Sequence, residues 1–116
     1  SGLTSDMKTL LDSADDKAKL AVAMYCYRAT RELGSLAASL GGVDALVFTG
    51  GVGENAAPVR ARICEAAAWL GLDFDATANA KGGPLVSKAG SRLAAWIVFT
   101  DEELTIARHT RQLLSA

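Results

Sequence analysis

The chain has little histidine, little cysteine and no excess of either charge. Its 116 residues include 1 histidine and 2 cysteines. Since no cysteines are paired at zinc-ligand spacing, this composition argues against a zinc-type site. The net charge is -1, and no basic patch points to a nucleic-acid partner. No apolar run approaches the roughly 20 residues of a membrane span. The polar start, residues 1–6, lacks the basic region of a signal peptide.

A chain of 116 residues is one domain or part of one. Because it has no initiator Met, we expect it to be a piece of a longer protein, with N-terminal processing as the alternative. The location that we expect is the cytoplasm. Half of its residues are hydrophobic, which is enough for a core. Cys26 and Cys64 each lie in an apolar helical pattern. We therefore expect buried free thiols rather than a disulfide.

Residues 15–40 have the pattern of one long helix. Apolar residues recur at spacings of three and four in a main stripe of Val22, Cys26, Ala29, Leu33, Leu36 and Leu40, beside a second stripe of Leu20, Met24 and Tyr27. A helix apolar over so much of its circumference is buried on more than one side. We expect it to pack on a sheet and to meet a neighbour, which could be another subunit. Gly41 and Gly42 end it.

The rest of the chain alternates strands and helices. Residues 43–49 are a short apolar strand, Pro58 opens a helix that buries Ile63, Ala66, Ala67 and Leu70, and Gly71 ends that helix. Residues 72–91 are expected to be loops with one short strand near Leu85, followed by a strand over 92–99 and a helix over 100–114. Trp69 and Trp96 are interpreted as core or interface aromatics. This order predicts an α/β fold.

The glycine-rich segment after the first strand carries the strongest functional signal. Gly50, Gly51 and Gly53 remove the β-carbons that would keep a ligand from the backbone. In open α/β sheets, ligands bind beyond the carboxyl ends of the strands, where this segment falls. A plain strand-to-helix turn is the structural alternative. Asn55 could also act as a helix N-cap.

Several charged residues can be explained by a structural or surface position rather than by a functional role. Thr100 and Glu103 match the pattern of a capping box, which would leave Glu102 without a structural task. Arg60 and Arg62 could approach a phosphate, although a solvated helix face explains them better. His109 is interpreted as a surface residue.

Three segments together resemble the acetate and propionate kinase family. Phe48–Asn55 is similar to the family motif FTxGIGEN, with Val52 in place of isoleucine. Residues 1–8 resemble SGxSxDxR, with Lys8 in place of arginine, which keeps the charge but loses the planar stacking group. Residues 100–103 resemble T-[ND]-E-E. The similarity covers essentially the whole chain.

The resemblance implies an actin-like ATPase fold of two lobes. Residues 1–116 would be most of the C-terminal nucleotide-binding lobe, a mixed sheet flanked by helices. The implied ligands are ATP or ADP and Mg²⁺, and the implied nucleotide-binding residues are Asp6, Met7, Lys8, Gly51, Val52, Gly53, Glu54 and Asn55. Glu102 would be the metal-site residue, with Glu103 as the alternative in the neighbouring register.

The implied activity of the intact protein is phosphoryl transfer between ATP and acetate, and the family is dimeric. Residues that handle the short-chain carboxylate belong to segments upstream of this chain, so no catalytic residue is assigned here. We expect this chain alone to bind nucleotide weakly and not to turn over. Propionate or butyrate kinase is the close alternative. A non-catalytic module that binds a nucleotide or a partner, and a purely structural α/β domain, are the alternatives from other classes.

Overall fold

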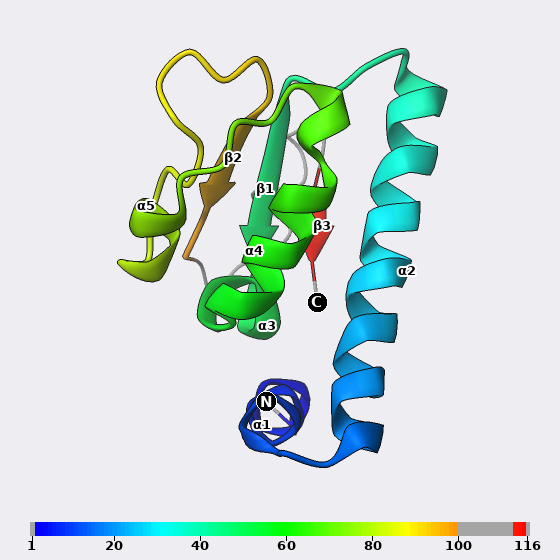
Figure 1. Cartoon of the computed structure of the whole chain (residues 1–116). Coiled ribbons are helices and arrows are strands. Elements are labelled where there is room, and N and C mark those ends of the chain that lie inside the picture. The colour runs from blue at the N-terminus through cyan, green and yellow to red at the C-terminus, as the bar shows by residue number, and fades with distance from the viewer. Residues whose placement is uncertain (1, 100–112, 116) are drawn as a thin grey trace.

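The computed structural model describes residues 2–99 and 113–115, with a small parallel sheet at the centre (Figure 1). The elements in chain order are α1 (Gly2–Asp12), α2 (Asp16–Leu40), β1 (Ala45–Thr49), α3 (Gly50–Asn55), α4 (Ala57–Ala66), the 3₁₀ helix η1 (Ala68–Leu70), α5 (Ala76–Ala80), β2 (Ala94–Ile97) and β3 (Leu113–Ser115). The strand order is β2-β1-β3. The predicted α/β layering is confirmed for this part of the chain.

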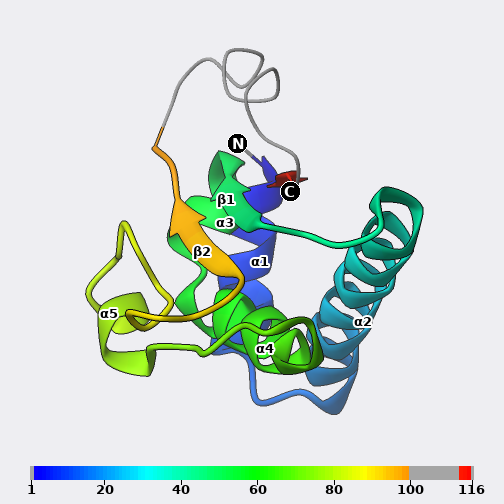
Figure 2. The same cartoon turned by 90° about the horizontal axis from the view of Figure 1, so that it is seen from above.

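The core lies between one face of the sheet and helices α2 and α4. Leu46 and Phe48 of β1 lie in register with Ala95 and Ile97 of β2, and alternation places all four on one face. They pack with Val22, Cys26 and Leu33 of α2 and with Val59, Ile63 and Cys64 of α4. Viewed from above, α2 and α4 run along this face, and α4 lies between α2 and α5 (Figure 2).

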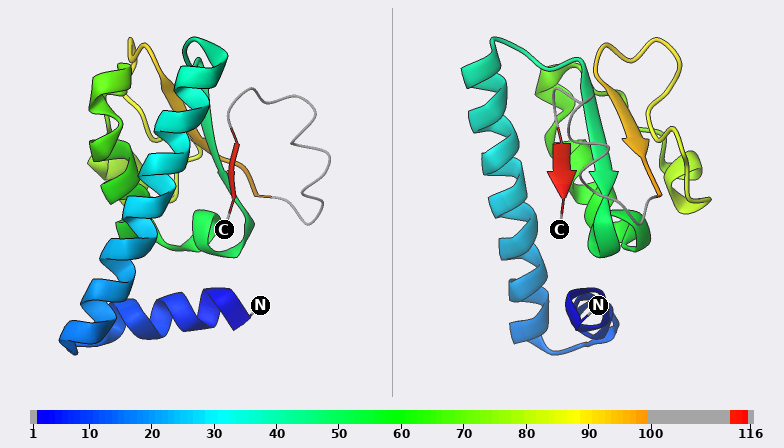
Figure 3. Two further views of the ribbon diagram at one scale, coloured as in Figure 1. Left: turned by 90° about the vertical axis from the view of Figure 1, so that its right-hand side faces the viewer. Right: turned by 180° about the vertical axis from the view of Figure 1, so that it is seen from behind.

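Helix α1 crosses the end of the sheet rather than lying along it (Figure 3). It passes next to α3 at the carboxyl end of β1 and contacts the first half of α2. Met7 of α1 is 4% exposed and belongs to the same core. This arrangement brings residues 7–12 beside the glycine-rich segment, although at least 38 positions separate them in the sequence, from Asp12 to Gly50.

The ends of α2 agree with the sequence prediction. The side chain of Asp15 accepts a hydrogen bond from the N–H of Lys17 at the first turn. At the other end Gly41 has φ 76°, and the N–H of Gly42 donates to the carbonyl of Ala37 at 2.9 Å. This is the left-handed glycine ending that satisfies the last helical carbonyls.

One expectation about the strands is wrong, and the mixed sheet is found only in part. Within the described residues the three named strands pair in parallel, and antiparallel bridges join Phe74 to Ser87 and Leu85 to Trp96 of β2. Leu113 and Leu114, predicted as the end of a helix, pair with β1 as part of β3. A short apolar run is compatible with a helix or with a strand, and here it forms a strand because it can pair with the edge of β1. The rest of that predicted helix, 100–112, lies outside the described residues.

The segment 72–91 contains a short helix that its loop-like composition, rich in Gly, Asp, Asn and Ser, does not predict. Helix α5 has only five residues, and Asp75 caps it by accepting from the N–H of Ala78. Five residues are too few to show a helical periodicity, so the sequence predicts a loop in this segment. The short strand expected near Leu85 is reduced to the bridge with Trp96.

Several apolar side chains are more exposed than predicted. Trp69 is 67% exposed and Trp96 39%, so neither is a core residue of this chain. Leu36, Leu40 and Ala66, predicted as buried, are also exposed. Leu36 and Leu40 belong to the last two turns of α2, and Ala66 ends α4 off the stripe that Val59, Ile63 and Ala67 form. The second stripe of α2, Leu20, Met24 and Tyr27, is 60%, 48% and 64% exposed.

Candidate functional site

The glycine-rich segment forms a short helix directly at the carboxyl end of β1. The chain enters α3 through Gly50, whose φ of 80° strongly favours glycine. The N–H of Gly50 donates to the Glu54 carboxylate at 3.0 Å. The side chain of Glu54 is therefore folded back onto its own helix and stabilises the turn.

Gly53 and Asn55 have structural tasks in this helix. A β-carbon on Gly53 would lie 3.3 Å from the carbonyl carbon of Phe48, so the absence of a side chain lets α3 pack on β1. Asn55 is not an N-cap, because it ends α3 and its amide donates to the carbonyl of Gly51 at 3.0 Å. Ala56 precedes α4 and makes no side-chain cap.

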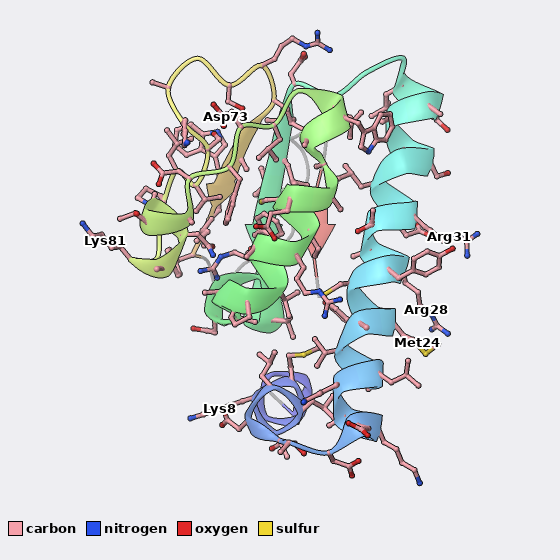
Figure 4. The ribbon with its side chains drawn as sticks, in the orientation of Figure 1. Lys8, Met24, Arg28, Arg31, Asp73 and Lys81 are labelled. Atoms are coloured by element: carbon pink, nitrogen blue, oxygen red, sulfur yellow. The ribbon has the colours of Figure 1, made fainter. Side chains whose placement is uncertain are left out.

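A cavity of about 580 Å³ lies between α1 and the segment α3–α4. Its walls are mainly apolar, with three polar side chains, and consist of Met7, Lys8, Leu11, Asp12, Gly51, Val52, Asn55, Ala56 and Pro58. Figure 4 shows Lys8 projecting outward from α1. A volume of this size and an apolar lining with few polar groups are typical of small-molecule sites. The cavity therefore has the size and the lining of a small-molecule site.

The structure brings together five of the nucleotide-binding residues predicted from sequence. Met7, Lys8, Gly51, Val52 and Asn55 all line the cavity. Met7 and Val52 are 4% and 1% exposed and belong to the core, so they form its floor.

Two other predicted residues shape the site without lining it. Gly53 faces β1 and Glu54 faces the N–H of Gly50. The side chain of Asp6 is not described, and Glu102 and Glu103 lie outside the described residues, as does His109.

Arg60 corrects the interpretation of a solvated helix face. Its side chain is 2% exposed. One guanidinium nitrogen, Nη1, donates to the carbonyls of Gly53 at 3.0 Å and Glu54 at 2.9 Å. These carbonyls belong to the last turn of α3, where helical partners are missing and a cation is favourable. Arg62, two positions later, is exposed as predicted.

The same guanidinium reaches α5 on its other side. Its Nε donates to Oδ1 of Asn79 at 2.7 Å and its Nη2 to the carbonyl of Asn79 at 3.1 Å. The amide of Asn79 in turn donates to the carbonyl of Ala57 at 3.0 Å. Burial lowers the pKa of Arg60, and neighbouring Cys64 opposes this shift. Burial likewise raises the pKa of the Cys64 thiol to about 12, in agreement with the predicted buried free cysteines.

Sequence reasoning missed Leu11, Asp12, Ala56 and Pro58 in the cavity wall and Arg60 and Asn79 behind it. Some of these residues could have been inferred from their spacing along a predicted helix. Lys8, Leu11 and Asp12 recur at spacings of three and four, which places them on one face of a helix. Arg60 precedes Cys64 by four residues and therefore shares its buried stripe. Nothing in the sequence pairs Arg60 with Asn79.

No cluster of three His, Cys, Asp or Glu side chains that could hold a metal ion is found among the described residues. Nor does any helix in that part of the chain have the length and hydropathy to cross a membrane.

Comparison with known proteins identifies relatives over nearly the whole chain. The sequence model of the acetokinase family matches residues 1–108. The chain is 56% identical over 116 residues to the acetate kinase of Rhizobium meliloti, and the match covers 100% of this chain and 30% of that protein. The chain thus spans less than a third of the length of the curated relatives it matches.

Solved structures of acetate and propionate kinases also match this chain. The structure of Porphyromonas gingivalis acetate kinase matches with a TM-score of 0.77 and 37% identity, covering 92% of this chain and 28% of that one. A propionate kinase from Francisella tularensis subsp. tularensis SCHU S4 matches with a TM-score of 0.74 and 33% identity, covering 96% and 29%.

Proposed function

The chain belongs to the acetokinase family, and from this premise we propose that it supplies the nucleotide-binding part of an acetate kinase. The observation that carries the proposal is the cavity between α1 and α3, which gathers Met7, Lys8, Gly51, Val52 and Asn55 from two distant segments of the sequence. The 56% identity to the Rhizobium meliloti acetate kinase supports acetate as the acceptor.

In this proposal the chain is the C-terminal part of a longer, cytoplasmic protein. Its parallel sheet and covering helices are part of one lobe of an actin-like ATPase fold. The residues that hold the carboxylate and the transferred phosphoryl group come from the remainder of the polypeptide. Phosphoryl transfer depends chiefly on positioning and charge stabilisation, so a nucleotide lobe alone does not complete the reaction.

The described residues suggest a division of roles within the nucleotide site. The backbone of Gly51 and Val52 lets the nucleoside approach α3, while Lys8 offers a cation at the cavity mouth. The resemblance to the family, rather than the described side chains, assigns Asp6 to the ribose hydroxyls. Gly53 and Glu54 hold the shape of α3.

We assign Glu102 to the magnesium ion that accompanies the nucleotide phosphates, with Glu103 as the alternative. Mg²⁺ is usually held by one or two carboxylates together with waters and phosphate oxygens, so one glutamate suffices on the protein side. When bound, this ion neutralises charge on the phosphates during transfer.

Propionate is the second candidate acceptor, favoured by the propionate kinase among the structural relatives. None of the residues lining the described cavity is assigned to the acceptor, so this chain does not discriminate the two. Rates with acetate, propionate and butyrate, measured on the longer polypeptide, decide between them. If the longer polypeptide turns over none of the three carboxylates, the alternative of a non-catalytic nucleotide-binding module is favoured.

We further propose a homodimer that uses the outer face of α2. Leu20, Met24 and Tyr27 are exposed along one stripe of this helix, and the guanidinium of Arg31 lies 5.9 Å from the ring centre of Tyr27. Figure 4 shows Met24, Arg28 and Arg31 pointing away from the sheet. Sedimentation of the longer polypeptide tests this: a dimer that Tyr27→Glu dissociates supports the proposal. A wild-type monomer at micromolar concentration contradicts it.

Titration of magnesium-ADP tests the nucleotide site. Gly51 lies within α3 and faces the cavity, so Gly51→Val fills ligand space without demanding a left-handed backbone. We expect Gly51→Val to abolish binding and Glu102→Ala to remove its metal dependence. Ser39→Ala, on an exposed position of α2, is the control. Binding unaffected by Gly51→Val would refute the assignment.

A further inference from the structure

The buried guanidinium of Arg60 lies directly behind the cavity wall. Its side chain is 2% exposed, and its four hydrogen bonds to neutral oxygens measure 2.7–3.1 Å. Burying a charged group is costly unless it is fully hydrogen-bonded. A buried arginine so completely engaged with main-chain and amide oxygens therefore has a positional task.

The hydrogen bonds of Arg60 join three elements. The side chain starts on α4, reaches the last-turn carbonyls of α3, and holds both the side chain and the carbonyl of Asn79 on α5. Asn79 closes the set by donating to the carbonyl of Ala57 at the start of α4. Figure 1 shows α4 with α3 below it and α5 on the side away from α2. The segment 72–91, which lines no part of the cavity, is thus coupled to the cavity wall.

We propose that Arg60, held by Asn79, is a positioning residue that fixes the α3 backbone for the nucleotide. The inference rests on the proposed function. Gly51 and Val52 form the α3 side of the cavity, and Arg60 fixes the same six-residue helix at its other end. Only a planar fork with several N–H groups satisfies acceptors on two sides at once, and lysine offers a single charged point.

Loss of this fork frees the last turn of α3 and therefore weakens nucleotide binding without touching the carboxylate acceptor. In the longer polypeptide we expect Arg60→Lys to raise KM for ATP roughly tenfold, which corresponds to about 1.4 kcal/mol. The KM for acetate should change less than about twofold on the same scale. A merely structural role would lower the amount of active enzyme, and hence the apparent kcat per total protein, with both KM values unchanged.

Two further variants complete the experiment. Asn79→Ala keeps Arg60 and its bonds to α3 but removes its side-chain partner on α5, so KM for ATP should rise in the same direction, which tests the proposal even if Arg60→Lys does not fold. Arg62→Lys makes the same exchange on an exposed position of α4 and should match the wild type.

The results separate this inference from the proposed function. A KM for ATP in Asn79→Ala and folded Arg60→Lys equal to that of Arg62→Lys would overturn the inference while the enzyme remains an acetate kinase. Equal rises in the KM values for ATP and acetate would overturn it as well. A wild-type protein without nucleotide-dependent turnover would contradict the proposed function and the inference with it.

Discussion

Gly53→Ala tests how closely α3 must approach the sheet. The added methyl group would lie 3.3 Å from the carbonyl carbon of Phe48 and 3.5 Å from its Cα. Because β1 is paired on both sides, its backbone cannot move away, and α3 must shift instead. Overpacking of this kind costs about 1–3 kcal/mol. Alanine regains up to about 1 kcal/mol of helix propensity, so the net loss of unfolding free energy is about 0–3 kcal/mol.

Gly34→Ala is the matched control, since it makes the same change within α2. A β-carbon there would meet only Cζ2 of Trp69 at 3.9 Å, an ordinary contact, so this variant should gain up to about 1 kcal/mol from helix propensity. The propensity gain cancels when the two variants are compared. We therefore expect urea unfolding to place Gly53→Ala about 1–3 kcal/mol below Gly34→Ala.

Nucleotide affinity should fall in Gly53→Ala and stay constant in Gly34→Ala, because only the first substitution displaces the cavity wall. Equal unfolding free energies in the two variants would refute the close approach of α3 to β1. Full nucleotide affinity in a destabilised Gly53→Ala would refute its link to the site.

Three other predictions concern the cavity, a helix end and a buried thiol. Lys8→Arg should tighten nucleotide binding about two- to fivefold in calorimetric titration, because a guanidinium can stack on the base and an ammonium cannot; unchanged or weaker binding would contradict the place of Lys8 at the cavity mouth. Gly41→Ala should lower the unfolding free energy by about 1–2 kcal/mol, since its φ of 76° is strained for alanine although no atom lies within 4 Å of the new methyl group; a variant as stable as wild type would contradict the left-handed ending. In the unfolded chain the Cys64 thiol ionises near its ordinary pKa of 9.0, whereas burial raises the pKa of the folded thiol to about 12. The unfolding free energy should therefore fall as the pH rises above 9, and below pH 9 this thiol should make no pH-dependent contribution. Cys64→Ala should flatten that fall in urea titrations, and an unchanged slope would contradict the burial of the thiol.

The sequence was most informative where a single local rule decides the structure. Asp15 and Gly41 bound α2 because capping and the left-handed turn act within a few residues. The strand before Gly50 was recognisable from its continuous apolar run. The motif in Phe48–Asn55 pointed to the segment that lines the cavity, and the resemblance added Met7 and Lys8.

The unpredicted features depend on contacts between distant segments. Arg60 shares the buried helical phase of Cys64, but its charge suggests a surface residue, and its partner Asn79, 19 residues away, cannot be identified from the sequence. The pairing of Leu113 with Val47 likewise overrides a local preference that fits a helix. Trp69 lies exposed on a helical turn of three residues, where no periodicity indicates which side faces the core.

The most direct test of the central claim is photoaffinity labelling with an azido-adenosine diphosphate, followed by mapping of the labelled peptides. The account predicts labels on residues 7–12 of α1 and residues 51–58 of α3 and α4, all suppressed by excess ADP. Labels confined to other segments, or insensitive to ADP, would contradict the assignment of this cavity to the nucleotide.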